Sequence, residues 1–232
     1  VIWLAGCTGT VTPEQSAGTL PPAPVAEQRP FIVESPHGHR ADPYYWLRDD
    51  ERADPDVIAY LTAENEYYDA YRAGYAATTA TIEAELIGRI QQDDTSVPYQ
   101  KGDYLYSVQY EAGKEYPIHV RADATGQVQV LVDVNELALG HSYMNVTNLS
   151  VSPNQQLLAY MVDTTGRRQY ELRIRDLTTG QDYVETLTGL SPAIAWAKDN
   201  KTVFVIENDP QTLLSTRVLK YEIGSASETA EL

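Results

Sequence analysis

The chain has 232 residues, 43% of them hydrophobic and 9% aromatic, which is enough apolar material for the core of one large domain or two modest ones. Its formal net charge of −16 argues against a nucleic-acid binder, because such a protein neutralises phosphates with Lys and Arg. The single Cys excludes an internal disulfide and a zinc site built on cysteines. The surplus acid fits plain solubility best, and attraction of cationic partners second.

The chain begins with VIWLAGC, a short apolar run followed by small residues and a thiol. Leu4-Ala5-Gly6-Cys7 matches the lipobox of bacterial lipoprotein signal peptides. Residues 1–7 are therefore predicted to end such a signal, with Cys7 as the lipidation site; the alternative is a chance Cys after an apolar run. Residues 8–30 are rich in Thr, Pro, Ala and Gly and predict a flexible tether. A lipid-anchored bacterial protein of the periplasm or cell envelope is expected.

Residues 31–95 predict a helical segment. Asp54 can cap a helix whose first turn accepts Pro55. A second helix is expected from about Thr79 to Ile90. The first helix carries one apolar and aromatic stripe at three- and four-residue spacing: Val57, Tyr60, Leu61, Tyr68, Tyr71 and Tyr75. Such faces need a surface to pack against.

From Val97 onward the hydrophobic period changes to two, which is typical of strands. Turn residues such as Gly102-Asp103, Thr125-Gly126, Pro153-Asn154 and Thr179-Gly180 separate the strands. The fold class is therefore predicted as mainly β, preceded by the helical segment.

One phrase occurs twice in this β region. KEYPIHVRADATGQ (114–127) returns as RQYELRIRDLTTGQ (168–181), an offset of 54 residues. A four-strand pattern that recurs at this spacing indicates a β-propeller, with Thr-Gly as the hairpin turn before the outer strand of each blade. Residues 96–232 are read as an incomplete, about three-bladed propeller, with blades at about 97–140, 145–190 and 191–232. A β-sandwich with accidental similarity is the alternative.

Five stretches resemble a known family: ADPYYWLRDD (41–50), GRIQQDDTSVPY (88–99), GKEYPIHVR (113–121), DVNELALGHSY (133–143) and VDTTGRRQYELRIRDLTTG (162–180). In this order they resemble the N-terminal part of oligopeptidase B, in the prolyl oligopeptidase family of serine peptidases. The resemblance covers about residues 31–221.

The resemblance implies an α/β-hydrolase domain with a Ser-Asp-His triad, capped by a seven-bladed propeller that admits short peptides. It implies cleavage after Arg or Lys, and packing of the helical segment on the hydrolase domain. No G-x-S-x-G motif occurs in this chain, so no catalytic residue is assigned here and the chain alone is predicted to be inactive. The alternative function is a non-catalytic lipoprotein propeller that binds a partner or ligand.

Other clusters of reactive side chains are assigned structural roles, and no metal or cofactor is predicted. His37 and His39 lack an obvious third ligand, although Asp42 is near. The acidic run from Asp49 to Asp56 lacks calcium-loop spacing. Asp93-Asp94 is expected to end the second helix and open the propeller, and Arg167-Arg168 to form surface salt bridges near Asp163. Substrate-binding residues are left unassigned.

Overall fold

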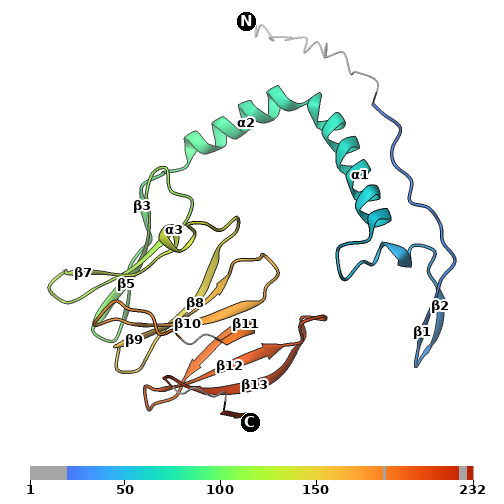
Figure 1. Ribbon diagram of the computed structural model, residues 1–232. Helices are drawn as coiled ribbons and strands as arrows, with labels where there is room; N and C mark the ends of the chain where they lie inside the picture. The colour runs from blue at the N-terminus through green and yellow to red at the C-terminus, as the bar shows by residue number, and fades with distance from the viewer. Residues whose placement is uncertain (1–19, 185–186, 225–228, 232) are drawn as a thin grey trace, which may run out of the picture. The chain divides into compact units, whose positions relative to one another are not determined.

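The computed structural model describes residues 20–184, 187–224 and 229–231, and the chain divides into two compact units after Ile90 (Figure 1). The first unit holds a hairpin, a short 3-10 helix and two α-helices. Its elements are β1 (Ile32–Ser35), β2 (Gly38–Ala41), η1 (Tyr45–Leu47), α1 (Pro55–Ala73) and α2 (Ala76–Arg89).

Helix α1 begins where the sequence predicts. The Asp54 carboxylate accepts hydrogen bonds from the backbone N–H groups of Asp56 (2.9 Å) and Val57 (3.4 Å), which satisfies two free donors of the first turn. Helix α2 begins at Ala76 rather than at about Thr79. The helical conformation is interrupted only at Gly74 and Tyr75. Helix α2 begins directly after them because the next residues are alanines, which have high helix propensity.

Trp46 joins the extended N-terminal segment to α1. Its indole Nε1 donates to the carbonyl oxygen of Glu27 (2.8 Å), and its ring lies 6.2 Å from that of Tyr60. The Arg29 guanidinium covers the Trp46 ring at 4.2 Å and donates to the carboxylate of Asp56 (2.8 Å). The ADPYYWLRDD stretch thus fixes the start of the helical segment.

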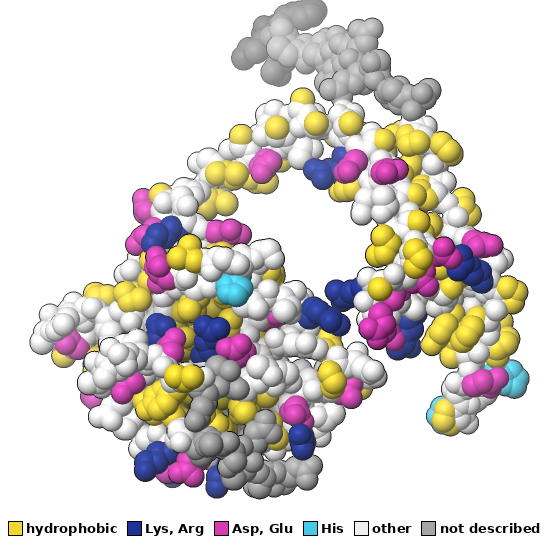
Figure 2. Space-filling model, viewed as in Figure 1, with side chains coloured by type: hydrophobic (Ala, Val, Ile, Leu, Met, Phe, Trp, Pro, Cys, Tyr) yellow, Lys and Arg dark blue, Asp and Glu magenta, His cyan; other side chains and the backbone are white. Residues whose placement is uncertain are grey.

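The helical segment exposes most of its apolar side chains (Figure 2). Among its described residues only Val57 is buried. The exposed side chains are Ile58, Leu61, Tyr68, Tyr71, Tyr75, Ile82, Leu86, Ile87 and Ile90. An apolar surface of this extent is characteristic of an interaction site. No helix in the described part of the chain is both long and apolar enough to cross a lipid bilayer.

The second unit contains two antiparallel sheets. The first sheet, called the first blade, has the order β3-β5-β6-β7, with β4 also paired to β5. The second has the order β8-β9-β10-β11-β12-β13-β14. The elements are β3 (Asp94–Thr95), β4 (Tyr99–Lys101), β5 (Tyr104–Tyr110), β6 (Ile118–Ala122), β7 (Val128–Asp133), α3 (Val134–Leu137), β8 (Asn145–Val151), β9 (Leu157–Asp163), β10 (Tyr170–Asp176), β11 (Leu187–Trp196), β12 (Thr202–Asn208), β13 (Ser215–Glu222) and β14 (Thr229–Glu231).

Strand β11 joins two blades without a loop. Its first part pairs with β10, its second part pairs with β12, and the register shifts between Leu190 and Ile194. Gly189 has a φ of +70°, which only glycine adopts without strain, and Pro192 lacks a donor for a continuous ladder. We call β8–β10 with the start of β11 the second blade, and the rest of the sheet the third.

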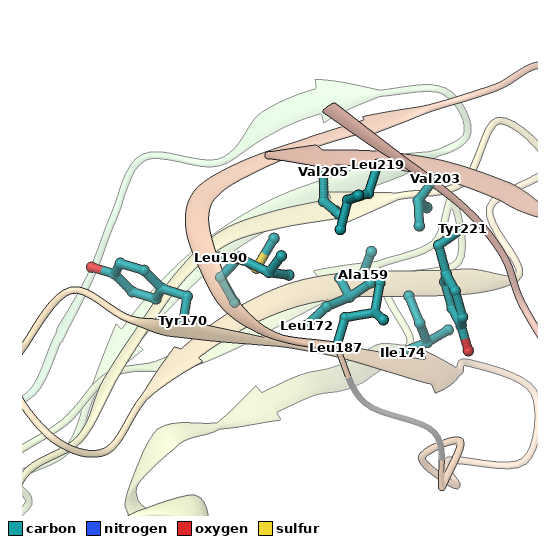
Figure 3. Close-up of a cluster of buried hydrophobic side chains, with 11 residues drawn as sticks. Ala159, Tyr170, Leu172, Ile174, Leu187, Leu190, Val203, Val205, Leu219 and Tyr221 are labelled. Carbon is teal, nitrogen blue, oxygen red and sulfur yellow. The ribbon is translucent and has the colours of Figure 1, made fainter. Parts of the chain in front are cut away.

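The second blade is buried on both faces. Leu158, Tyr160 and Val162 of β9 face the first blade, where they meet Tyr106 and Leu131. The intervening Ala159 and Met161 face the third blade. They form a second core cluster with Leu172 and Ile174 of β10 and with Val203, Val205, Leu219 and Tyr221 of the third blade (Figure 3). Since alternate side chains of a strand point to opposite faces, an unbroken apolar strand between two sheets fits a propeller blade.

The loops of the second unit lie at two ends. The chain passes from Ile90 into β3 at what we call the proximal end, because Asp94 pairs with Tyr110 at the end of β5. The β5–β6, β7–β8, β9–β10 and β12–β13 loops share that end, since the strands are antiparallel. The turns at 102–103, 123–127, 152–156, 177–181 and 197–201 form the distal end.

The duplicated phrase adopts equivalent positions in two blades. Gly126 (φ +84°) lies in the turn from β6 to β7. Gly180 (φ +75°) lies in the turn that follows β10, after which Asp182 bridges back to Arg175. Thr-Gly therefore forms the hairpin before the outer strand of both blades, which confirms that prediction.

Candidate functional site

Two arginines in equivalent positions of the repeat cross from one blade to the next. Arg121 lies on β6, and its Nη1 donates to the carbonyl oxygen of Gln155 in the second blade (2.9 Å). Arg175 lies on β10, and its Nη1 donates to the carbonyl oxygen of Leu131 in the first blade (2.9 Å). The first two blades are thus joined by reciprocal, charge-assisted hydrogen bonds.

Arg175 is held by a carboxylate as well. Its Nε and Nη2 lie 2.6 and 2.9 Å from the two carboxylate oxygens of Asp182, a bidentate arrangement. The Tyr160 hydroxyl donates to the same carboxylate (3.1 Å). Burial, followed by the nearby Asp182 charge, raises the pKa of Tyr160 to about 12. This hydroxyl therefore stays protonated at physiological pH and serves as a donor.

His119 lies between the first and second blades, and its burial there predicts a pH-dependent stability. It lines a small cavity of about 50 Å³ together with Lys101, Tyr106 and Leu158. Burial lowers the pKa of His119 below its usual value. The unfolded chain, with a His pKa of about 6.5, binds more protons between the two values, so stability is lost as pH falls below about 6.5.

We therefore expect the urea midpoint to decrease between pH 7 and pH 5, and this decrease to be smaller in His119→Gln. The control is His141→Gln, which alters an exposed histidine of the same unit. Equal pH profiles for wild type and His119→Gln would contradict the assignment.

At the proximal end, Asp163 holds a tight turn instead of a salt bridge. Its buried carboxylate accepts hydrogen bonds from the backbone N–H groups of Thr165 (2.8 Å), Gly166 (3.0 Å) and Arg168 (2.8 Å). Arg167 and Arg168 are exposed, and no ion pair links either one to a carboxylate of the described residues. The expected salt bridges are therefore wrong, because backbone N–H groups occupy the Asp163 carboxylate.

The proximal loops carry mixed charge. The exposed acids at this end are Asp93, Asp94, Glu111, Glu115 and Glu136, and the exposed bases are Lys114, Arg167 and Arg168. Lys114 is paired with Glu111 (2.9 Å) and lies 3.6 Å from Asp133. Exposed acids therefore outnumber exposed bases by five to three at this end of the described blades.

The remaining predicted clusters have structural roles. His39 lies 3.6 Å from Glu34 across the exposed β1–β2 hairpin, and Asp42 accepts a hydrogen bond from Arg40 (2.9 Å). Within the described ranges no three His, Cys, Asp or Glu side chains are close enough to hold a metal ion. Helix α2 ends at Arg89, so the expectation that Asp93-Asp94 ends it is wrong, whereas Asp94 does begin the first strand of the β region. The Asp93 carboxylate accepts a hydrogen bond from the N–H of Ala112 (2.7 Å) and so fixes the β5–β6 loop.

The predicted lipidation site, Cys7, lies outside the described residues. What the prediction missed is the pair Arg121 and Arg175. Both are Arg in the duplicated phrase, at an offset of 54 residues, and that recurrence was the available signal.

Comparison with a protein-family model identifies the family of this chain. Residues 24–232 match the model described as "Prolyl oligopeptidase, N-terminal beta-propeller domain". The chain belongs to the prolyl oligopeptidase family. As a member of this family it has a mainly β propeller domain preceded by a few helices, in agreement with the predicted fold class.

Three relatives place the chain within the prolyl oligopeptidase family. It is 40% identical to dipeptidyl aminopeptidase BI of Pseudoxanthomonas mexicana, over 95% of this chain and 33% of the relative. Oligopeptidase B of Leishmania major superposes with a TM-score of 0.80 at 30% identity, over 88% of this chain and 31% of that structure.

Oligopeptidase B of Trypanosoma brucei, solved in a closed form with covalently bound antipain, gives a TM-score of 0.78 at 29% identity over 88% of this chain and 31% of that structure. The chain spans about a third of the length of the curated relatives it matches.

Proposed function

We propose that this chain is the N-terminal propeller part of a serine oligopeptidase that cleaves short peptides after Arg or Lys. The observation that carries the proposal is the likeness to oligopeptidase B, at a TM-score of 0.80 over 88% of the chain. In the parent protein a serine would attack the scissile carbonyl with a histidine as base, through an acyl-enzyme. Those residues would belong to a C-terminal α/β-hydrolase domain, and this chain would be inactive by itself.

The exposed apolar face of α1 and α2 supports the proposal of a separate catalytic domain. Leu61, Tyr71, Ile82 and Leu86 are all about half exposed in the chain. A hydrolase domain of the same protein is the partner we propose for this face, in keeping with the family resemblance. The propeller would then filter substrates by size, admitting short peptides and excluding folded proteins.

Selection of basic peptides is proposed on the resemblance, with the net charge of −16 as secondary support. The resemblance also implies that the acidic pocket for the basic side chain belongs mainly to the hydrolase domain. We therefore place the groups that recognise the basic side chain in the hydrolase domain.

A second candidate is a dipeptidyl aminopeptidase, which releases dipeptides from a free N-terminus. The observation that favours it is the 40% identity to a protein of that name, over 95% of this chain. The two candidates share the serine mechanism and differ in whether a free substrate amine is required.

We also propose that Cys7 carries a lipid that anchors the protein in the cell envelope, on the basis of the Leu4-Ala5-Gly6-Cys7 lipobox. Metabolic labelling with a palmitate analogue tests this separately. Label is expected in the wild type and lost in Cys7→Ser, and an unlabelled wild type would contradict the anchor.

The test of the function is an amide-cleavage assay on the full-length protein with three substrates. These are an N-blocked arginyl amide, an N-blocked alanyl amide and an unblocked dipeptidyl amide with arginine second. The proposal predicts kcat/KM for the arginyl amide at least about a hundredfold above that for the alanyl amide, the discrimination expected of a site that pairs a charge. Activity confined to the unblocked substrate would favour the dipeptidyl aminopeptidase, and absence of turnover with all three would contradict both.

A further inference from the structure

A polar groove opens at the distal end between the first and second blades. Its volume is about 560 Å³, within the range of small-molecule sites. Four turns and the ends of three strands form its walls, and Arg121 on β6 contributes to its lining. The polar side chains that matter here are Asp103, Arg121, Asp123, Gln129 and Gln155.

Arg121 is a buried cation that has no anionic partner among the described residues. It is 4% exposed, and the Cζ atom of its planar guanidinium lies 4.0 Å from the centre of the Tyr104 ring. Its Nε donates to the side-chain oxygen of Gln129 (2.8 Å) and its Nη1 to the carbonyl oxygen of Gln155 (2.9 Å), both neutral acceptors. In the described part of the chain Nη2 has no acceptor, and no carboxylate lies within 4.0 Å. A buried guanidinium that lacks a counter-ion favours the binding of an anion.

The opposite charge lies on the rim of the same groove. Asp103 is exposed, and its Oδ2 accepts from Gln155 Nε2 (3.2 Å). Asp123 uses Oδ1 for the turn, accepting from Thr125 N–H (2.8 Å) and Gln127 N–H (3.0 Å), while Oδ2 has no partner among the described residues. The Thr125 hydroxyl also donates to Oδ1, and this bond is the largest cause of a lowered Asp123 pKa. Together with the backbone bonds it keeps the carboxylate ionised. The buried Oε1 of Gln155 also lacks a donor in the described structure.

This charge distribution selects one class of ligand. A simple inorganic anion would be repelled by the two rim carboxylates, and a metal cation by the guanidinium. A neutral sugar would leave both charges unpaired. We propose that the groove binds a small zwitterion, an α-amino acid or dipeptide. Its carboxylate lies on Arg121 Nη2 and its ammonium group lies between Asp103 and Asp123.

The binding site is tested by calorimetry on the full-length protein, with glycylglycine as the probe. Glycine serves as the shorter alternative, and N-acetylglycylglycine and glycylglycine amide each lack one of the two charges. Glycylglycine is expected to bind, and each singly charged analogue to bind at least about tenfold more weakly, since each loses a charge-assisted hydrogen bond. Tighter binding of glycine would assign the groove to free amino acids. Equal binding of inorganic phosphate would overturn the zwitterion assignment.

Two variants assign the binding to this groove. Arg121→Gln is expected to weaken glycylglycine binding at least about tenfold. The double variant D103N/D123N keeps an acceptor oxygen at each position. It should weaken glycylglycine binding similarly, whereas N-acetylglycylglycine, which the rim carboxylates repel, should bind at least as tightly as to the wild type.

Lys201→Gln removes one positive charge from an exposed distal turn outside the groove, and should leave the affinity at the wild-type value. If Arg121→Gln fails to fold, the assignment of binding to the groove depends on D103N/D123N alone. Unchanged glycylglycine affinity in D103N/D123N, or no binding by the wild type at millimolar concentration, would overturn the proposal. Because no step uses peptide cleavage, the result is independent of the amide assay.

Discussion

Replacing Leu158 by alanine is expected to lower the free energy of unfolding by about 2–5 kcal/mol. Leu158 lies on the middle strand of the second blade, is fully buried, and packs in the core shared with the first blade. The second blade is held between two others, so neither neighbour can move to close the cavity without losing contacts of its own. Urea unfolding followed by tryptophan fluorescence measures the change, since Trp196 packs against the adjacent core.

Val130→Ala is the matched control for this substitution. Val130 lies on β7 of the first blade and is 54% exposed, so the same type of truncation should change stability by less than about 0.5 kcal/mol. If the two substitutions had equal effects, the face of β9 that carries Leu158 would not be an interface between blades.

Arg175→Gln is the second substitution with a large expected effect, about 2–3 kcal/mol of destabilisation. The side chains of Arg175 and Asp182 are 19% and 30% exposed, so the loss of one partner leaves a largely desolvated carboxylate. The same change removes the hydrogen bond to the carbonyl oxygen of Leu131, which joins the blades. Urea unfolding again provides the measurement.

Arg173→Gln controls for the loss of charge on the same strand. Arg173 lies two positions away on the same face and pairs with Glu171 of its own strand (2.9 Å). Its replacement should cost no more than about 1 kcal/mol, as is usual for surface ion pairs. A cost for Arg173→Gln that equalled that of Arg175→Gln would show that the bond between blades adds nothing.

The strands and their burial were largely predictable from local pattern. The run LLAYMVD of β9 has no polar alternation, and the strand is buried on both faces. In contrast, β13 alternates between exposed Val218 and buried Leu219, as a strand with one solvent face should. The Asp54 cap and the Thr-Gly turns were predictable for the same reason, because both depend on residues within a few positions of one another.

The contacts that join the blades were not predictable in the same way. Arg175 binds a backbone carbonyl oxygen 44 positions away, and a carbonyl acceptor leaves no mark in the sequence. The duplicated phrase showed that Arg121 and Arg175 are equivalent but not what either one binds. Asp163 was paired with the wrong group for a related reason, since its hydrogen bonds to backbone N–H groups depend on how the turn closes.

The groove depends still more on tertiary structure. Asp103, Arg121 and Gln155 come from three separate segments that meet only when the first two blades pack together. Only Arg121 belongs to a recognisable motif, the duplicated phrase, and that motif does not show that it lines a groove. The continuity of β11 was also hidden, because the blade boundary lies at a bend within one strand rather than in a loop.

Labelling of the full-length protein with a fluorophosphonate tests the central claim most directly, namely that this chain is the propeller part of a serine peptidase. Peptide mass spectrometry locates the modified residue. The account predicts about one label per molecule, on a serine beyond Leu232, and none on the isolated 232-residue chain. A full-length protein that takes up no label, or a label on a serine within residues 1–232, would contradict it.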